Sequence, residues 1–342
     1  MAGKSTLNRL ELGNGQRSRY KKISFWRDSV DELLVNVFVE AHAVVPQRIV
    51  LDIDTTDMAL HGNQEDRFFH GYYGHYCYLP LYIFCGDHVL GARLRPSNVG
   101  PAVGSKKEVE RIVTQIREHW PEVEIILRGD SGFCSDDLMT WCEQNRVDFV
   151  VGMARNPRLQ GLVADALVEA KRQFEGTQKP ARVFVEFEHE TLNGSWSKKR
   201  RVVAKAEHID GKSNPRFIVT SLDSESWETR KLYEELYCAR GDMENRIKEQ
   251  FVLFADRVSA STLRANQLRI YFSVMAYTLI NGLRRLGLRA TQFATAQVGT
   301  IRLRLLKIGA LVRVTVRKVW VRMASSYPYQ ALFFQTLRQL RQ

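Results

Sequence analysis

The last quarter of this 342-residue sequence contains no acidic residue. None of the 38 Asp and Glu residues lies after Asp256, whereas Lys and Arg occur 15 times between Arg257 and Arg341. The first 256 residues hold 35 Lys and Arg against 38 Asp and Glu, so the net charge of +12 comes from the C-terminal end. Such one-sided charge is typical of a surface that binds a polyanion, with a merely solvated basic surface as the alternative.

Cysteine and long apolar runs are also scarce. The five cysteines are odd in number and form no C-x-x-C pair, which favours a reducing compartment and argues against structural zinc. The N-terminus has no apolar signal region, and the longest apolar helical run, 270–283, is too short to cross a bilayer. We therefore expect a cytoplasmic protein.

Hydrophobic residues make up 44% of the chain, which is enough for a large core. Apolar strand-like segments at 49–54, 123–129 and 147–153 alternate with amphipathic helical segments at 106–120, 135–144 and 158–172. This alternation predicts an α/β fold built on a sheet. Between Lys179 and Ser221 the pattern changes to strands and hairpins, which indicates a β-rich insertion.

Two of the predicted strands end in acids. Asp52 and Asp54 lie two positions apart at the end of the first strand, on one face, and Asp130 ends the strand that starts near Val123. Carboxylates at strand ends fall where α/β sheets place their sites. Asp52 competes with Asp54 for the role of first acid, and the sequence Asp54-Thr-Thr favours Asp54.

A third acid lies in a strongly helical segment at 225–254. Tyr237, Arg240, Glu244 and Lys248 are spaced by three and four residues, so they form one stripe on the helix. By itself this stripe is typical of an exposed ion-pair ladder. Together with the two strand-end acids it supplies three hard carboxylates, the ligands that Mg²⁺ prefers.

The basic C-terminal region carries a further candidate surface. Residues 311–323 alternate as a strand or hairpin with cationic side chains pointing outward, namely Arg313, Arg317, Lys318 and Arg322. We expect these side chains to contact a polyanion such as DNA.

These features together resemble the bacterial insertion-sequence transposases of the DDE type, among them insertion-sequence group 1380. The likeness consists of Asp54-Thr-Thr, the strand ending at Asp130, the Tyr237-x-x-Arg240-x-x-x-Glu244 signature and the β-rich insertion before it. It covers roughly 49–258. The family signature often continues with Lys seven residues after the Glu, where this chain has Phe251, so Lys248 is the nearest candidate.

The resemblance implies an RNase H-like mixed sheet flanked by helices. In this interpretation an N-terminal arm and helix (1–48) precede the first part of the catalytic core (49–155). A mainly β insertion (156–224) separates it from the last catalytic helix (225–258), and a basic α/β region (259–342) follows.

It further implies that Asp54, Asp130 and Glu244 bind Mg²⁺, with Mn²⁺ as a substitute, and that Tyr237 and Arg240 contact DNA phosphates. The implied activity is cleavage of double-stranded DNA at element ends and transfer of the 3′ hydroxyls to target DNA. A homodimer on paired ends, associated with the bacterial nucleoid, would carry it out. Two alternatives stay open: an inactive or truncated DNA-binding remnant, and an RNase H-like nuclease that hydrolyses without joining.

Overall fold

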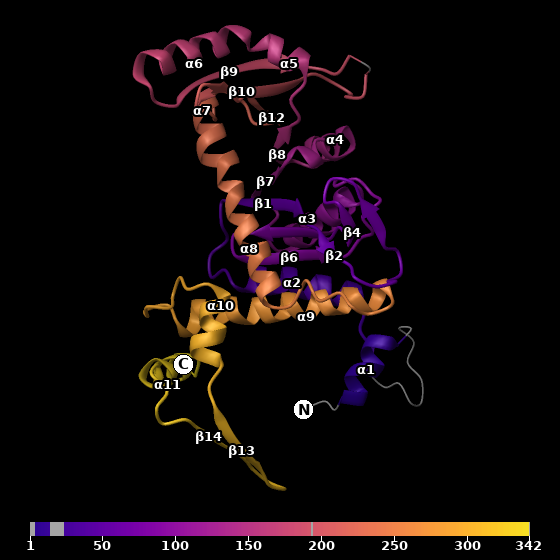
Figure 1. Cartoon of the computed structure of the whole chain (residues 1–342), viewed down its shortest axis with the longest axis vertical. Coiled ribbons are helices and arrows are strands. Elements are labelled where there is room, and N and C mark those ends of the chain that lie inside the picture. Colours follow the sequence, from indigo (N-terminus) through magenta and orange to yellow (C-terminus); the bar gives the residue numbers. More distant parts are fainter. Residues whose placement is uncertain (1–3, 14–23, 193, 342) are drawn as a thin grey trace.

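A computed structural model describes residues 4–13, 24–192 and 194–341 (Figure 1). Its centre is a nine-stranded mixed sheet in the order β11-β10-β12-β8-β7-β1-β5-β6, with β9 also paired to β10. Strands β1, β7 and β8 run parallel, while β5 is antiparallel to β1 and β6 to β5. The core strands are β1 (Arg48–Thr55), β5 (Leu81–Cys85), β6 (His88–Arg93), β7 (Glu124–Gly129) and β8 (Val147–Met153). The predicted α/β class with a mixed sheet flanked by helices is confirmed.

Helices cover this part of the sheet because their apolar residues recur at helical spacing. In α3 (Ser105–His119), Val109, Ile112, Val113 and Ile116 are buried against strand residues such as Leu51. Helices α2 (Arg27–Glu40) and α4 (Asp136–Gln144) add side chains to the same core. A small separate sheet of β2 (Met58–Ala59), β3 (Phe68–His70) and β4 (His75–Tyr78) lies between β1 and β5 in the chain.

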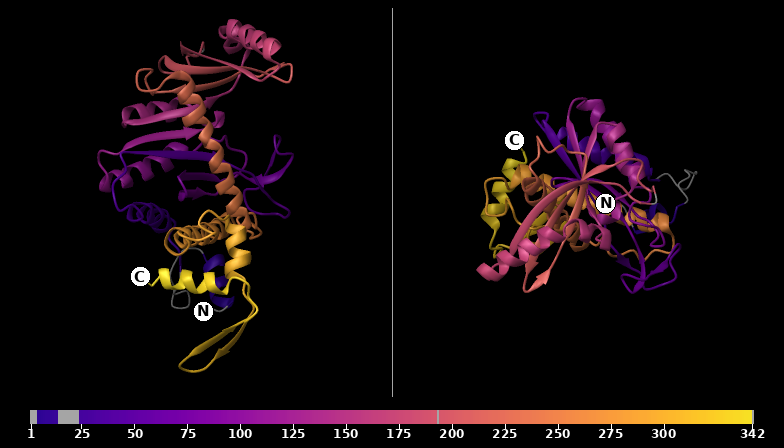
Figure 2. Two further views of the ribbon diagram at one scale, coloured as in Figure 1. Left: turned by 90° about the vertical axis from the view of Figure 1, so that its left-hand side faces the viewer. Right: turned by 90° about the horizontal axis from the view of Figure 1, so that it is seen from above.

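The insertion extends the central sheet instead of forming a separate one. It contains α5 (Pro157–Leu162), α6 (Ala164–Thr177), β9 (Ala181–His189), β10 (Arg200–Ile209), β11 (Lys212–Ser213) and β12 (Arg216–Thr220). Strand β12 pairs antiparallel with β8, placing Val219 opposite Val151. Figure 2 shows the insertion strands continuing the twist of the core strands. Main-chain pairing therefore ties the insertion to the core.

A long helical segment follows the insertion and runs past the core to α9 (Figure 1). Sequence periodicity predicts a uniform helix, but the segment is irregular in the middle. Between α7 (Thr229–Lys231) and α8 (Gly241–Val252) lie a π-helical turn, η2 (Leu232–Tyr237), and a 3₁₀ turn, η3 (Cys238–Arg240). The π turn ends where an arginine from β7 binds the carbonyl of Leu236. Such turns within helices occur frequently at functional sites.

The C-terminal region packs on α8 through a second core. Met243 and Ile247 of α8 are buried with Ile270 and Val274 of α9 (Leu263–Gly282). Sequence periodicity also predicts that Phe272 and Leu279 are buried, which is wrong: they are 47% and 75% exposed. The helix instead buries polar side chains that find partners, for example Gln267, which binds the main chain of Ala92 and Leu94.

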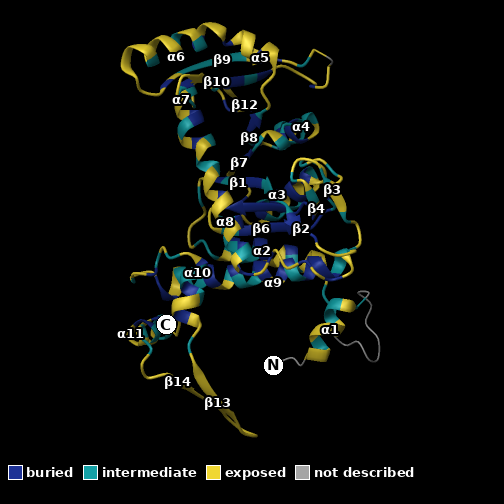
Figure 3. Cartoon of the chain, viewed as in Figure 1, coloured by how far each residue is buried: buried dark blue, intermediate teal, exposed yellow. Residues whose placement is uncertain are grey.

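The rest of the region is peripheral. It contains η4 (Leu283–Gly287), α10 (Val298–Ile301), η5 (Arg302–Leu306), β13 (Ala310–Val314), β14 (Val319–Met323) and α11 (Gln330–Gln339). Strands β13 and β14 form a hairpin that projects from the body and is exposed on both faces (Figure 3).

The N-terminal arm contains structure that the sequence pattern did not reveal. The sequence pattern of residues 1–24 predicts an extended or loosely packed arm, but α1 (Lys4–Leu12) is helical. It is held to α9 by the pair Glu11–Arg269, with Nε 2.8 Å from Oε1. The remainder of the expected arm, 1–3 and 14–23, lies outside the described residues. Within the described part of the chain, no helix has the length and apolar character needed to cross a membrane.

Candidate active site

The two strand-end acids lie at the same edge of the sheet. Parallel pairing of β1 with β7 sets Ile53 opposite Gly129, so Asp54 and Asp130 follow at neighbouring strand ends. Asp54 Oδ1 accepts a hydrogen bond from the N–H of Thr55 at 2.8 Å. Asp130 Oδ1 accepts one from the N–H of Gly132 at 2.9 Å and caps the 3₁₀ turn η1 (Ser131–Phe133). Both carboxylates are therefore held by local backbone.

The third acid, Glu244, is linked to this edge of the sheet by Arg240, which lies on the same irregular helix. Its Nη1 lies 3.8 Å from Asp54 Oδ2 and its Nη2 lies 3.8 Å from Glu244 Oε1. The side chain of Asp54 is 13% exposed and that of Glu244 is 51% exposed, with Arg240 at 22%. Arg240 of the predicted stripe thus faces the strand end of Asp54, and its guanidinium lies between two carboxylates from distant parts of the chain.

The charges of the three acids act on one another. The pKa of Asp54 is raised to about 6, chiefly by burial. The N–H of Thr55 and the charge of Arg240 work against this rise, while the nearby carboxylates of Asp130 and Glu244 contribute to it. Burial lowers the pKa of Arg240, but the surrounding acidic groups outweigh this and raise it overall. The site therefore holds more negative charge than its own arginine neutralises.

The chemistry of these donors fits a divalent cation, since all three are hard carboxylate oxygens in a site with unbalanced negative charge. Among residues 4–13, 24–192 and 194–341, however, there is no group of three or more His, Cys, Asp or Glu side chains close enough together to hold a metal ion. Arg240 stands between two of the candidate ligands. For the three carboxylates to bind one metal ion, this guanidinium and the half-exposed Glu244 side chain would have to move.

Tyr237 reaches the loop that carries Asp130 because residue 152 is glycine. A Cβ atom at Gly152 in β8 would lie 2.6 Å from the Tyr237 hydroxyl oxygen and 2.8 Å from the Ser131 nitrogen. The Arg240 guanidinium lies 5.9 Å from the centre of the Tyr237 ring. Burial raises the pKa of Tyr237, so its phenol is neutral at physiological pH. Sequence analysis did not identify Gly152.

Lys248 lies elsewhere on the helix surface. It is exposed one turn beyond Glu244 and lines an open groove of about 580 Å³ together with Asp242, Arg246 and Arg284. No described contact joins it to the ion pairs of Arg240.

Asp52, the competing first acid, is engaged in a buried ion pair. Arg128 donates from Nε to Asp52 Oδ1 at 2.5 Å and from Nη2 to Oδ2 at 2.8 Å, and both side chains are less than 10% exposed. Arg128 Nη1 also donates to the carbonyl of Leu236 in η2 at 2.5 Å. The sequence pattern did not point to Arg128, because its partners lie 76 and 108 residues away in the chain.

The cationic residues predicted in the C-terminal region lie on the exposed hairpin. Strand register puts Arg313 opposite Trp320 and Leu311 opposite Arg322, on one face, while the other face is wholly aliphatic. Lys318 Nζ lies 5.8 Å from the centre of the Trp320 ring, and Arg317 sits in the connecting turn. The hairpin is remote from the three acids along the molecule (Figure 1).

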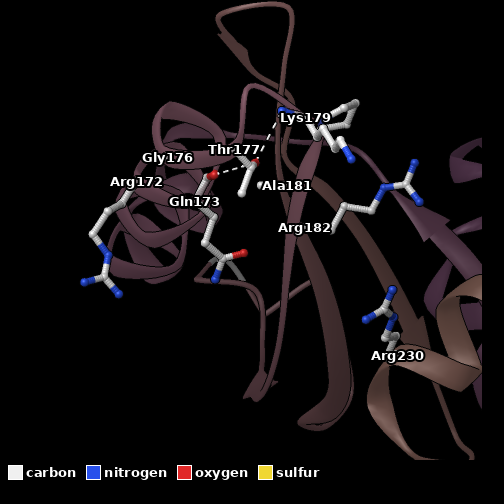
Figure 4. Close-up of a pocket in the computed structure, with 9 residues that line it drawn as sticks. Arg172, Gln173, Gly176, Thr177, Lys179, Ala181, Arg182 and Arg230 are labelled. Atoms are coloured by element: carbon white, nitrogen blue, oxygen red, sulfur yellow. Dashed lines mark hydrogen bonds between the residues drawn. The ribbon is translucent and has the colours of Figure 1, made fainter.

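A cavity of about 910 Å³ lies in the insertion and away from the acids (Figure 4). Four cations line it: Arg172, Lys179, Arg182 and Arg230. Its arginines are already paired, Arg172 with Glu169 and both Arg182 and Arg230 with Glu234. These carboxylates offset the positive charge of the cavity, so we assign the candidate active site to the strand ends and not to this cavity.

These observations describe an α/β protein whose mixed sheet has two acids at neighbouring strand ends and a third acid on an adjacent helix. The chain belongs to the family described as transposase DDE domain, group 1, which matches residues 1–342. Among solved structures, it is similar to piggyBac transposase in a synaptic complex with hairpin DNA, with 9% identity and a TM-score of 0.42. That match covers 73% of this chain and 49% of the piggyBac chain, so this chain spans about half its length. No curated protein matches.

Proposed function

We propose that this chain is the DNA transposase of a bacterial insertion sequence. It cuts double-stranded DNA at the ends of its element and joins the freed 3′ hydroxyls to target DNA. The observation that carries the proposal is the position of Arg240, 3.8 Å from both Asp54 and Glu244, beside the strand end of Asp130 in a chain of the DDE transposase family.

In this proposal Asp54, Asp130 and Glu244 hold Mg²⁺, or Mn²⁺ in its place. When bound, such ions activate the attacking oxygen and neutralise charge on the leaving oxygen of a phosphodiester. The chain's own contribution is to fix the donors. Main-chain N–H groups orient Asp54 and Asp130, while the exposed Glu244 supplies a ligand that adjusts to the substrate.

Arg240 and Tyr237 position the phosphate in this account. The two ion pairs of Arg240 are long, at 3.8 Å, so its guanidinium can exchange them for phosphate oxygens when DNA and metal arrive. The neutral phenol of Tyr237 is held beside the Asp130 loop, where it donates a hydrogen bond to the same phosphate. Lys248 contacts the DNA backbone one turn further along the helix.

DNA outside the cut site binds to the basic C-terminal hairpin. Arg313, Lys318 and Arg322 share one face with Trp320, and Arg317 lies at the tip, so the hairpin presents cations without a single acid. Neutralisation of phosphates by these side chains supplies affinity that falls with salt. The active assembly is a homodimer that holds two element ends.

The test uses a plasmid carrying the coding sequence with its flanking DNA, incubated with purified protein in Mg²⁺. Nicks at the element boundaries and joined products in a second plasmid are expected. Salt-sensitive binding without nicks in Mg²⁺ or Mn²⁺ would identify an inactive remnant. Nicks without joined products would identify a nuclease, so each alternative has its own outcome.

A further inference from the structure

An aromatic loop at 68–76 projects beside the acidic site and has no part in the function described so far. We propose that its tip, Tyr72 and Tyr73, stacks against an unpaired DNA base next to the bond that is cut. This inference rests on the proposed function, because it assigns a second contact to the same DNA substrate.

The base of the loop is firmly anchored. Ser97 Oγ donates to the carbonyl of Phe68 at 3.0 Å, and the Tyr78 hydroxyl donates to the carbonyl of Glu65 at 2.5 Å. Glu65 Oε2 in turn accepts a hydrogen bond from the N–H of Leu263 at the start of α9. Strands β3 and β4 pair from Phe68 opposite Cys77 to His70 opposite His75. The aromatic tip is therefore presented on a fixed frame.

The tip exposes aromatic surface that nothing in the described chain covers. Tyr72 is 88% exposed, Phe69 is 58% exposed and Tyr76 is 44% exposed. The rings of Tyr72 and Tyr73 meet edge to face with centroids 5.1 Å apart, and the ring of His70 lies 4.8 Å from that of Tyr73. Packing contacts thus hold Tyr73 while leaving the ring of Tyr72 open to a ligand.

The loop is tied to the strand end that carries Asp54. His75 Nε2 lies 2.8 Å from Asp57 Oδ2, and the ring of His75 lies 6.1 Å from that of Tyr73. Asp57 follows Asp54 by three residues, so their Cα atoms are at most about 11 Å apart. Burial, followed by the charges of Asp57 and Asp54, raises the pKa of Tyr73 to about 12, which agrees with this proximity.

An unpaired base is the ligand that fits such a tip. Bases offer a flat π surface to exposed aromatic rings, and enzymes acting on DNA commonly hold displaced bases by stacking. A phosphate held at Asp54 and Asp130 would place its flanking nucleotides within reach of this loop. By contrast, Trp227 is partly buried against a hydrophobic cluster and carries the Arg48 guanidinium 5.5 Å from its ring centre.

The experiment measures binding of a 20-nucleotide single strand containing 2-aminopurine, and of a duplex of equal length, in EDTA so that cleavage plays no part. Proteins are the wild type, Tyr72→Ala, Tyr72→Trp and the control Phe272→Ala, which removes a 47% exposed ring on α9. Loss of one stacked base weakens single-strand binding by about 5- to 150-fold. Tyr72→Ala should show this loss and Tyr72→Trp should not.

A second readout locates the contact. Irradiation of a strand carrying 5-iododeoxyuridine should cross-link to the peptide that contains Tyr72 and Tyr73. Unchanged single-strand affinity in Tyr72→Ala, equal losses for strand and duplex, or cross-links only to other peptides would overturn the inference. If the wild type never cuts DNA but Tyr72→Ala still loses single-strand binding, the proposed function fails and the stacking site stands. Association between copies of the chain that Tyr72→Ala abolishes, without any effect on DNA, would assign the tip to a protein contact and also overturn the inference.

Discussion

Arg128 donates two hydrogen bonds to the Asp52 carboxylate, and its Nη1 donates a third to the carbonyl of Leu236 at 2.5 Å. One side chain thus joins β1, β7 and the π turn η2. Asp54 lies two residues beyond Asp52, Asp130 two beyond Arg128, and Tyr237 directly after Leu236. The relationship fixes the register between the elements that carry the proposed catalytic groups.

Variants of the Asp52–Arg128 ion pair can separate its contribution to folding stability from its contribution to cleavage. Arg128→Met alone leaves Asp52 buried and unpaired, which should cost about 3–5 kcal/mol of stability. The double variant Asp52→Leu/Arg128→Met removes both charges and should unfold near the wild-type urea midpoint. It still lacks the contact to Leu236, so we expect cleavage to fall by about 10²-fold. Wild-type cleavage in a stable double variant would show that Arg128 has no positioning role.

Gly152 should tolerate no side chain. Gly152→Ala places a Cβ within 2.8 Å of the Ser131 nitrogen as well as against the Tyr237 hydroxyl, so backbone must move at the Asp130 loop. We expect a loss of about 1–3 kcal/mol in urea unfolding together with a loss of cleavage. Gly176→Ala is the matched control, because no atom lies within 4 Å of its Cβ and it lies in α6. It should be neutral or stabilising by about 0.5–1 kcal/mol; equal behaviour of the two variants would refute the close-approach explanation.

The local sequence pattern predicted the strands and the helix that carry the site better than it predicted the long-range contacts between them. The strand ends at Asp54 and Asp130 and the stripe from Tyr237 to Glu244 follow from periodicities of two and 3.6, which are properties of short segments. The contacts of Arg128 were not predictable, because its partners Asp52 and Leu236 lie 76 and 108 residues away in the chain.

The errors have the same origin. The apolar spacing of Phe272 and Leu279 suggested burial, but neighbouring elements bury Gln267 and other polar side chains of α9 through hydrogen bonds instead. The short helix α1 has no buried residue, so its sequence carries little periodic signal and its position depends on Arg269 of α9.

The raised pKa of Asp54 makes its ionised form unfavourable in the folded protein. Its folded pKa of about 6 exceeds the ordinary 3.8, so this site is most stable below pH 4 and loses stability as pH rises through 6. Asp54→Asn removes the charge and should stabilise the metal-free protein by about 1–3 kcal/mol at pH 7.5, with no gain at pH 4. Urea unfolding at the two pH values measures this. Asp137→Asn, at a side chain 73% exposed, is the control; a gain at pH 4 as large as that at pH 7.5 would contradict the account.

The C-terminal hairpin should govern the salt dependence of DNA binding. Replacing Arg313, Lys318 and Arg322 by Ala removes three cations from one face, so the slope of log K against log salt should become shallower by roughly 2–3. Fluorescence anisotropy with a duplex of random sequence from 50 to 300 mM salt gives the slope. The triple variant of Lys171, Arg172 and Lys212, exposed cations of the insertion, should leave it within about 1 unit of the wild type. An unchanged slope in the hairpin variant would place the DNA elsewhere.

The most direct test of the central claim is strand cleavage by Asp130→Ala in Mg²⁺ on the plasmid that carries the coding sequence and its flanks. Asp130 caps η1 at the end of β7, and its charge acts on Asp54 within the same site. The account predicts that Asp130→Ala binds this DNA with wild-type affinity and cuts it at least about 10³-fold more slowly, while Asp137→Ala cuts normally. Cleavage by Asp130→Ala at the wild-type rate would contradict the assignment of these acids as the catalytic centre.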